Sequence, residues 1–156
     1  MKTKRISWDA ASGMLLGLAI GDALGASLEC HSSREPENYH REYKSGGPRN
    51  LPAGYWTDDT SMALAIAEGL LKRNGEFDPH LIMENFVSWM TDGEFSSTGT
   101  CFDIGTTCQM ALGTYRKDKS NPYCGPTDPY SAGNGALVRT APVIIAARDE
   151  REAVEN

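Results

Sequence analysis

The sequence predicts an all-α fold, a compact orthogonal bundle of helices. Apolar residues recur at helical spacing in several stretches, of which residues 58–74 are the clearest. Residues that cap or stop helices stand where these stretches begin and end. No run that alternates apolar and polar residues rises above chance, so we expect no strand.

The first helix is expected to begin at Trp8, because Ser7 can cap it and Asp9 is favourable in its first turn. Glycine costs up to ~1 kcal/mol relative to alanine inside a helix, so a row of glycines on one face needs a reason. That row predicts the close approach of another helix or of a ligand. The glycines recur every four residues, at Gly13, Gly17, Gly21 and Gly25.

The second and third helices have clear end signals. The second is expected over residues 58–74, followed by Gly75 as a C-terminal stop. Asp78 is expected to cap the third helix, with Pro79 at its first position. The two helices are therefore joined by a short turn.

The second half of the chain predicts two more helices. One is expected over residues 103–117, and another over residues 136–148, kinked or broken near Pro142. Asp149 resembles the cap of a further helix. Polar, glycine-rich loops separate these elements, over residues 30–54, 90–102 and 120–135.

The composition bounds the class of protein. A chain of 156 residues is one domain by default, long enough to bury a substantial core. Its 21 acidic and 15 basic residues give a net charge of −6, which argues against nucleic acid or an anionic membrane as the main partner. We find no apolar run near the ~20 residues that cross a bilayer. The four cysteines form no C-x-x-C pair, which predicts free thiols in a cytoplasmic protein rather than a zinc site.

A secretory signal peptide is the alternative for the N-terminus. Basic residues within the first five positions precede an apolar stretch at residues 14–20. Asp9 before the stretch, Gly17 inside it and Asp22 after it argue against this alternative. We favour the first helix of a cytosolic domain.

The stretch W-T-D-D-T at residues 56–60 is the most informative for chemistry. Thr57, Asp58 and Asp59 offer three hard oxygen ligands in one turn, which suit Mg²⁺, Ca²⁺ or Mn²⁺. The simpler interpretation is a helix cap followed by favourable first-turn charges. An octahedral ion takes about six ligands, so one turn cannot complete such a site.

Other residues are candidates to complete a site. Asp22 lies in an apolar helix, where an acid is either exposed or paired. Asp103 stands at a loop-to-helix junction, where it could instead be a cap. The G-N-G segment at residues 133–135, with Arg139, could hold a phosphate, although a plain turn explains it equally well.

In their order and spacing, these elements together resemble the ADP-ribosylglycohydrolase family, from about residue 12 to 147. The resemblance implies an all-α domain spanning residues 1–156 and a two-metal Mg²⁺ or Mn²⁺ centre. The elements are G-D-A-L-G at 21–25, Glu29, W-T-D-D-T at 56–60, D-I-G-T-T at 103–107 and G-N-G-A-L-V-R-T-A-P at 133–142.

The resemblance also implies roles for single residues. Glu29 matches the family glutamate that lies near the metals and the substrate. Asp103 matches the acid proposed to act near the scissile ribose, and Asp22 would be structural support. The metal ligands would be Thr57, Asp58 and Asp59. The residues around ADP-ribose would be Gly133, Asn134, Gly135 and Arg139.

The chain departs from the family in length. Family members are typically near twice as long, and their second half carries a D-x-D-T element that completes the metal centre and does not occur here. The chain therefore resembles an N-terminal portion of the domain. We expect exposed apolar faces, for example along residues 137–145, and hence self-association or a second chain that completes the site.

The expected function is hydrolysis of the glycosidic bond between ADP-ribose and a protein side chain or a small molecule. Metals would orient the ribose and activate water, and Glu29 or Asp103 would take a proton or stabilise the sugar cation. One alternative is an inactive ADP-ribose-binding protein, and another is a structural member similar to a lens crystallin. An isoprenoid synthase is set aside, because Asp58 and Asp59 lack the third acid of a D-D-x-x-D helix.

Overall fold

The computed structural model describes residues 6–30 and 41–147, and the regular elements in these ranges are helical apart from one isolated bridge between Gly46 and Leu51. The predicted all-α class is confirmed. The α-helices are α1 (Trp8–Gly25), α2 (Asp58–Lys72), α3 (Pro79–Asp92), α4 (Thr106–Lys117) and α5 (Ala141–Ala146). Two 3₁₀ turns are η1 (Ala26–Leu28) and η3 (Asn134–Ala136).

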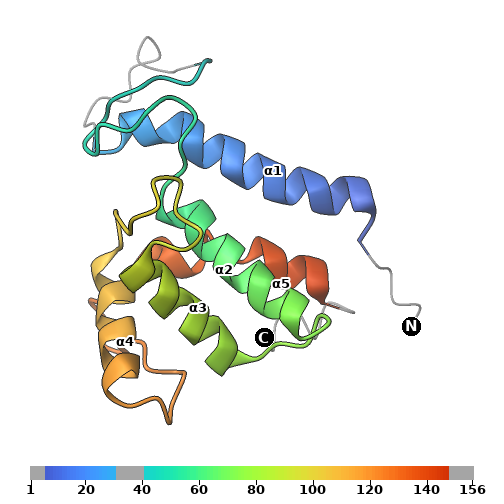
Figure 1. Ribbon diagram of the computed structural model, residues 1–156, viewed down its shortest axis with the longest axis vertical. Helices are drawn as coiled ribbons and strands as arrows, with labels where there is room; N and C mark the ends of the chain where they lie inside the picture. The colour runs from blue at the N-terminus through green and yellow to red at the C-terminus, as the bar shows by residue number, and fades with distance from the viewer. Residues whose placement is uncertain (1–5, 31–40, 148–156) are drawn as a thin grey trace.

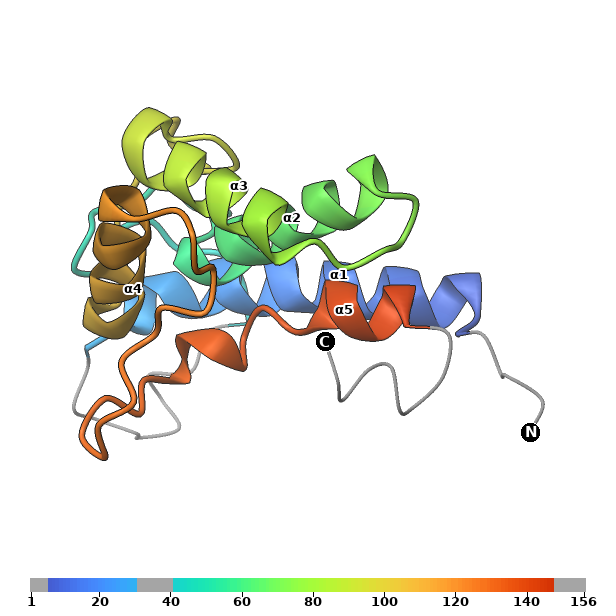
Figure 2. The same cartoon turned by 90° about the horizontal axis from the view of Figure 1, so that it is seen from below.

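Helix α2 is the centre of the arrangement, because it packs against α1, α3 and α5 (Figure 1). Helix α3 returns beside α2 in the opposite direction. In the view from below, α4 stands across the direction of α1 at one end of the molecule (Figure 2). The acid-bearing first turn of α2 thereby lies near the C-terminal end of α1 and the start of α4.

The hydrophobic core lies mainly between α2 and α3. Gly69 of α2 allows the close approach, since a Cβ there would lie 2.9 Å from Ile82. Buried Asn85 of α3 donates to the Ala65 carbonyl of α2 across the same contact, at 2.8 Å. The buried members of the core are Met62, Ala65, Ile66, Leu70, Ile82, Phe86, Trp89 and Leu112.

Several predicted helix ends are confirmed. Ser7 caps α1 by accepting a hydrogen bond from the Ala10 amide. Asp78 caps α3 in the same way, and Pro79 occupies the first position. Helix α2 ends two residues before the predicted Asn74, and Gly75 follows with φ +92° while its N–H donates to Leu70.

Two predicted helices are shorter in the structure. Helix α4 begins at Thr106 rather than Asp103, because Asp103 adopts a left-handed φ of 60° that no helix start accommodates. The helix predicted over residues 136–148 is divided into η3 and α5. Pro142 lies in the first turn of α5, where its missing N–H costs nothing, so it begins a helix rather than kinking one. Asp149 lies outside the described residues.

A single side chain joins α1 to the start of α2. The Asp22 carboxylate accepts hydrogen bonds from the backbone N–H and the hydroxyl of both Thr57 and Thr60, at 2.6–3.1 Å. Thr57 is the N-cap residue but gives α2 no side-chain cap of its own. Asp22 therefore caps α2 from another helix, in agreement with the predicted structural role.

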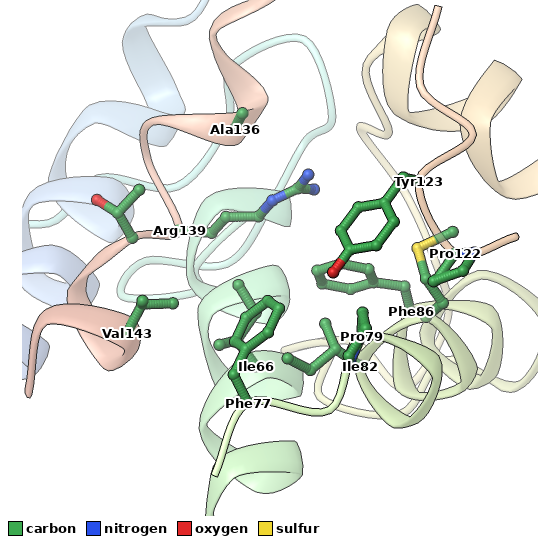
Figure 3. Close-up of a pocket in the computed structure, with 12 residues that line it drawn as sticks. Ile66, Phe77, Pro79, Ile82, Phe86, Pro122, Tyr123, Ala136, Arg139 and Val143 are labelled. Atoms are coloured by element: carbon green, nitrogen blue, oxygen red, sulfur yellow. The ribbon is translucent and has the colours of Figure 1, made fainter. Parts of the chain in front are cut away.

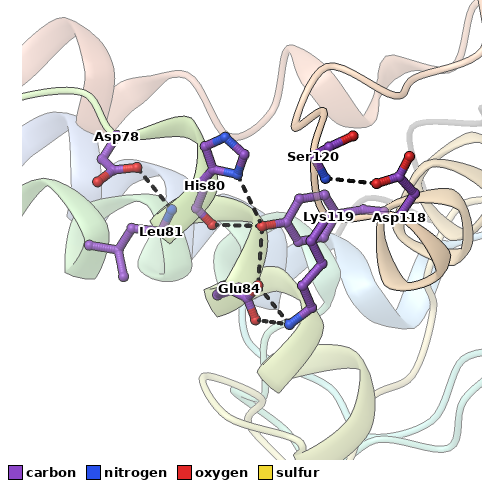
Figure 4. A network of polar contacts seen from close by, with 8 residues as sticks. Asp78, His80, Leu81, Glu84, Asp118, Lys119 and Ser120 are labelled. Atoms are coloured by element: carbon purple, nitrogen blue, oxygen red, sulfur yellow. Dashed lines mark hydrogen bonds and ion pairs between the residues drawn. The ribbon is translucent and has the colours of Figure 1, made fainter.

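A polar network fixes α4 against α3 (Figure 4). The buried Tyr115 of α4 donates to the Glu84 carboxylate at 3.1 Å and approaches His80 of α3. Burial and the negative charge of Glu84 raise the pKa of Tyr115 to about 12, so its hydroxyl keeps its proton. Lys119, just beyond α4, pairs with Glu84 at 2.8 Å.

Much of α1 is exposed, contrary to the prediction of a covered glycine face. A Cβ at Gly13, Gly17 or Gly21 would meet no atom of the described part of the chain within 4 Å. Leu16 and Ile20 are also more than half exposed. The expectation that no apolar run approaches the length that crosses a bilayer was wrong, because the segment Trp8–Leu28 is long and apolar enough by length and composition. Signal sequences and the core helices of soluble proteins have the same length and composition.

Two further expectations concern exposure and thiols. Leu137 is 73% exposed and Ile144 44%, in agreement with the expected apolar surface over residues 137–145, although buried Pro142 lies between them. The thiols of all four cysteines are free, as predicted.

The Asp22 bonds predict a large effect of one substitution. We expect Asp22→Asn to lower the free energy of unfolding by about 2–4 kcal/mol, because the amide group opposes two N–H and two hydroxyl donors with one acceptor oxygen. The matched control is Asp9→Asn, also on α1 but exposed, which should cost less than about 0.5 kcal/mol. Urea denaturation followed by circular dichroism measures both. Equal effects would contradict the cap.

The exposed face of α1 predicts self-association of the isolated chain. We expect sedimentation velocity to show concentration-dependent oligomers, because apolar surface is removed from water when copies associate. Replacing Leu16 and Ile20 by lysine should shift the distribution to monomer. Leu71→Lys on α2, where leucine is 74% exposed, is the control and should change little. A monomeric wild type would be inconsistent with this interpretation.

Candidate active site

One pocket of about 350 Å³ gathers most of the predicted site residues. We name it the acidic pocket. It brings together seven of the predicted residues, from η1, α2, the segment before α4 and the segment around η3. Its lining residues are Glu29, Cys30, Asp58, Asp59, Asp103, Gly105, Thr106, Thr107, Cys108, Gly133, Asn134 and Gly135.

Burial and neighbouring negative charges raise the pKa of two aspartates in the pocket. Burial, followed by the charges of Asp59 and Asp103, raises the pKa of Asp58 to about 7. Burial and the charges of Asp22 and Asp103 also raise the pKa of Asp59. The site therefore resists carrying its full negative charge, and a bound cation would relieve that repulsion.

Glu29 and Asp103 behave as a pair that shares one proton. Burial, a hydrogen bond with Asp103 and neighbouring charges raise the pKa of Glu29 to about 8. Burial opposes a low pKa for Asp103, but hydrogen bonds from Glu29 and Arg49 outweigh it and lower that pKa. Near neutral pH the proton therefore resides on Glu29, and Asp103 is anionic.

Two of the five described non-glycine residues with a positive φ line this pocket. Cys30 has φ 61° and Asp103 has φ 60°, values in the left-handed region that residues with a side chain rarely adopt. Each residue ends the segment that leads into the pocket. The left-handed backbone turns the chain at these points, and such strain persists where the surrounding structure holds it in place.

The G-N-G segment packs against the first turn of α4. A Cβ on Gly133 would lie 3.1 Å from the Thr107 hydroxyl, and one on Gly135 would lie 3.0 Å from the Cys108 sulfur. The two glycines therefore permit this close approach. Gly105 is the N-cap of α4 and supplies no side-chain hydrogen bond, which leaves the amides of the first turn available at the pocket wall.

Thr57 lies outside the residues that line the pocket. It is 1% exposed, and its hydroxyl donates to Asp22 at 2.7 Å. The hydroxyl hydrogen is thus committed to Asp22, which leaves only lone pairs for any other partner. Its assignment as a metal ligand stays a prediction.

The donor chemistry of the pocket fits a hard divalent cation. The carboxylates of Glu29, Asp58, Asp59 and Asp103 are the oxygen donors that Mg²⁺ and Mn²⁺ prefer. Within residues 6–30 and 41–147, however, no group of three or more His, Cys, Asp and Glu side chains is arranged to hold an ion. The described residues alone therefore form no complete metal site, and the two-metal centre stays a prediction.

Arg139 is not brought to the acidic pocket. It lines a second, largely apolar cavity of about 230 Å³, shown in Figure 3. Its guanidinium lies 4.7 Å from the centre of the Phe86 ring, and Nη1 contacts the sulfur of Met62 at 2.9 Å. It also contacts Cys108, at 3.6 Å. The predicted phosphate contact of Arg139 therefore has no counterpart among these interactions, and its role in substrate binding stays a prediction.

Sequence reasoning missed Arg49. Its Nε and Nη2 atoms donate to Oδ1 of Asp103, at 3.0 and 2.5 Å, across 54 positions of the chain. Arg49 lies in an irregular loop with no periodic pattern, so nothing local distinguished it from other surface arginines. Asp103 Oδ2, by contrast, is buried and receives no hydrogen bond from an amide, hydroxyl or guanidinium group of the residues that the structure describes.

Comparison with known proteins identifies the family. The sequence model of the ADP-ribosylglycohydrolase family matches residues 2–156. The ADP-ribosylarginine hydrolase Tri1 of Serratia proteamaculans is 45% identical over 142 residues, which are 91% of this chain and 38% of that protein. The ADP-ribosyl-(dinitrogen reductase) glycohydrolase of Rhodospirillum rubrum is 37% identical over 144 residues, 88% of this chain and 45% of that protein.

A solved structure agrees with the sequence matches. A chain described as an ADP-ribosylglycohydrolase-related protein complex superimposes with a TM-score of 0.72 at 40% identity, over 93% of this chain and 45% of that chain. This chain thus spans less than half the length of these relatives. The predicted resemblance is confirmed, and the chain belongs to the ADP-ribosylglycohydrolase family.

Proposed function

We propose that this chain carries part of a metal-dependent site that hydrolyses the N-glycosidic bond between ADP-ribose and an arginine side chain of a protein. The observation that carries the proposal is the acidic pocket, where Glu29, Asp58, Asp59 and Asp103 meet the G-N-G segment. The name of one relative, an ADP-ribosylarginine hydrolase, supports arginine as the acceptor, and the name of another, an ADP-ribosyl-(dinitrogen reductase) glycohydrolase, supports a protein substrate.

Asp103 and Glu29 have complementary parts in this reaction. Hydrolysis breaks the bond between the anomeric carbon and the guanidine nitrogen and forms a bond from that carbon to water oxygen. Asp103, anionic at neutral pH, faces the positive charge of the guanidinium or of the developing sugar cation. Glu29, whose pKa is about 8, holds a proton beside it and can give that proton to the departing guanidine. The Glu29 carboxylate left behind then takes a proton from the attacking water, which restores its starting state.

Asp58 and Asp59 would hold Mg²⁺ or Mn²⁺ at the wall of the pocket, with Thr57 beneath them. Such an ion orients ribose hydroxyls and lowers the pKa of bound water. The open first turn of α4 and the exposed backbone of Gly133 and Asn134 offer N–H groups to the pyrophosphate of ADP-ribose.

We further propose that a polypeptide equivalent to the rest of these relatives completes the site. An octahedral ion needs about six ligands, more than the pocket provides. The match covers 38–45% of the relatives, and the exposed face of α1 offers apolar surface for such a polypeptide. The complete protein, with this chain as part of it, is then the hydrolase.

Ligand binding tests the proposed site. We expect Mn²⁺ to bind this chain, or the chain with its completing polypeptide, and ADP-ribose to bind more tightly with Mn²⁺ than with EDTA. Asp59→Asn should weaken Mn²⁺ binding at least tenfold, because it removes a charged oxygen ligand. Asp118→Asn, at an exposed site beyond α4, is the control and should bind as wild type. Isothermal titration calorimetry measures these affinities.

Each outcome of this titration has a distinct meaning. Metal-independent ADP-ribose binding without hydrolysis of ADP-ribosylated protein would favour the inactive binding protein instead. Binding of neither ligand by the complete protein would refute the site. Unchanged Mn²⁺ affinity in Asp59→Asn would exclude Asp59 as a metal ligand.

The raised pKa values predict how stability depends on pH. The pKa of Glu29 is raised from 4.5 to about 8 and that of Asp58 from 3.8 to about 7. The folded chain therefore holds more protons than the unfolded chain between about pH 4 and pH 8. Its free energy of unfolding falls as the pH rises through this window. We expect the melting temperature in EDTA to be lower at pH 8 than near pH 5.5.

Two comparisons accompany this measurement. Mn²⁺ should raise the melting temperature more at high pH, because the ion binds deprotonated carboxylates. Glu29→Gln should flatten the pH dependence, since glutamine does not titrate. A melting temperature that rises between pH 5.5 and pH 8 in EDTA would show that these carboxyls are not buried together.

A further inference from the structure

The acidic pocket already has a guanidinium group at its edge. Two nitrogens of Arg49, Nε and Nη2, contact the single oxygen Oδ1 of Asp103. The Asp103 side chain is 16% exposed, and that of Arg49 is 49% exposed. The carboxylate is thus a fixed, mostly buried acceptor, whereas the arginine approaches it from solvent.

The chemistry of the pocket favours a guanidinium at this place. Four carboxyl groups line the pocket, and no lysine or arginine is among its lining residues within the described ranges 6–30 and 41–147. Any planar cation with two adjacent N–H donors can make the contacts that Arg49 makes. The acceptor in the proposed function, an arginine side chain, carries the same group.

The Arg49 side chain can leave Asp103 without disturbing the fold, because other residues hold the surrounding backbone. The backbone around it forms a tight turn, in which Gly46 and Leu51 exchange two hydrogen bonds at 2.9 and 3.0 Å. Leu51 is buried and anchors the turn, while Arg49 is exposed. A change of side-chain rotamer is enough to vacate Asp103.

We propose that, in the unliganded chain, Arg49 occupies the position beside Oδ1 of Asp103 that the guanidinium group of the acceptor would take. We name this position the guanidinium seat. The Arg49 side chain must move away from it when an acceptor binds. The inference rests on the proposed function for the identity of the acceptor. Arg49 then competes with the acceptor for Asp103. It neutralises that carboxylate and lowers the affinity of the pocket for guanidinium compounds. The contact between Arg49 and Asp103 also disfavours ligands that have no guanidinium group to take the place of Arg49.

The test uses agmatine, a small guanidinium compound, and putrescine, which carries the same charge on two amines. We expect Arg49→Gln to bind agmatine roughly three- to tenfold more tightly than wild type, because the seat is vacant. Asp103→Asn should lose the binding. Arg73→Gln is the matched control, since Arg73 makes a similar half-exposed ion pair with Asp78 away from the pocket. Calorimetry at fixed ionic strength gives the affinities, and thermal melts confirm folding.

The outcomes separate the two proposals. Unchanged agmatine affinity in Arg49→Gln would overturn the inference, and so would an equal gain for putrescine, which would indicate only the loss of a positive charge. Mn²⁺-dependent ADP-ribose binding with no response of agmatine to Arg49→Gln would leave the proposed function standing alone. The converse result would support the guanidinium seat and refute the metal-dependent site.

Discussion

The geometry of the acidic pocket depends on the carboxylate of Asp22. Its two oxygens bind the backbone and hydroxyl groups of Thr57 and Thr60, and Asp58 and Asp59 lie between these threonines in sequence. Fixing both ends of this turn fixes the direction in which the two acids project. Asp22 thus positions the pocket although it does not line it.

This arrangement has an electrostatic cost. The charge of Asp22 contributes to the raised pKa of Asp59, so the residue that orients the acids also makes their ionisation harder. Burial is the larger contribution. Groups outside α2 act against the negative charge of the pocket. Arg49 neutralises Asp103, and the open amides of α4 face the same pocket. The carboxylates of the unliganded pocket therefore repel one another, and this repulsion favours the binding of a cation.

Local signals in the sequence predicted most helices but not what joins them. Ser7, Asp78 and Pro79 act within a few residues of the helix that they begin, so their positions alone indicated α1 and α3. The predicted start of α4 was wrong, because Asp103 has a left-handed backbone that the helical pattern does not reveal. The side chain of Asp103 contacts Glu29 and Arg49, which are distant in sequence.

The same distinction applies to the site. The order of the acidic and glycine motifs matched a family, and that match brought together Glu29, Asp58, Asp59, Asp103 and the G-N-G segment. The position of Arg139 on Phe86 and that of Arg49 on Asp103 depend on tertiary packing, which periodicity does not encode. The exposure of the glycine face of α1 could not be predicted either, because a regular pattern of glycines does not tell whether another helix or a ligand covers them.

The exposure of α1 also gives the chain an internal optical reporter. Trp8 is 84% exposed at the start of α1, whereas Trp89 is 1% exposed in the core and Trp56 donates its indole N–H to the Phe95 carbonyl. Fluorescence from Trp8 is therefore the emission most open to quenching by iodide. Anything that covers the first turns of α1 will shield that indole, while Trp89 reports separately on whether the core remains intact.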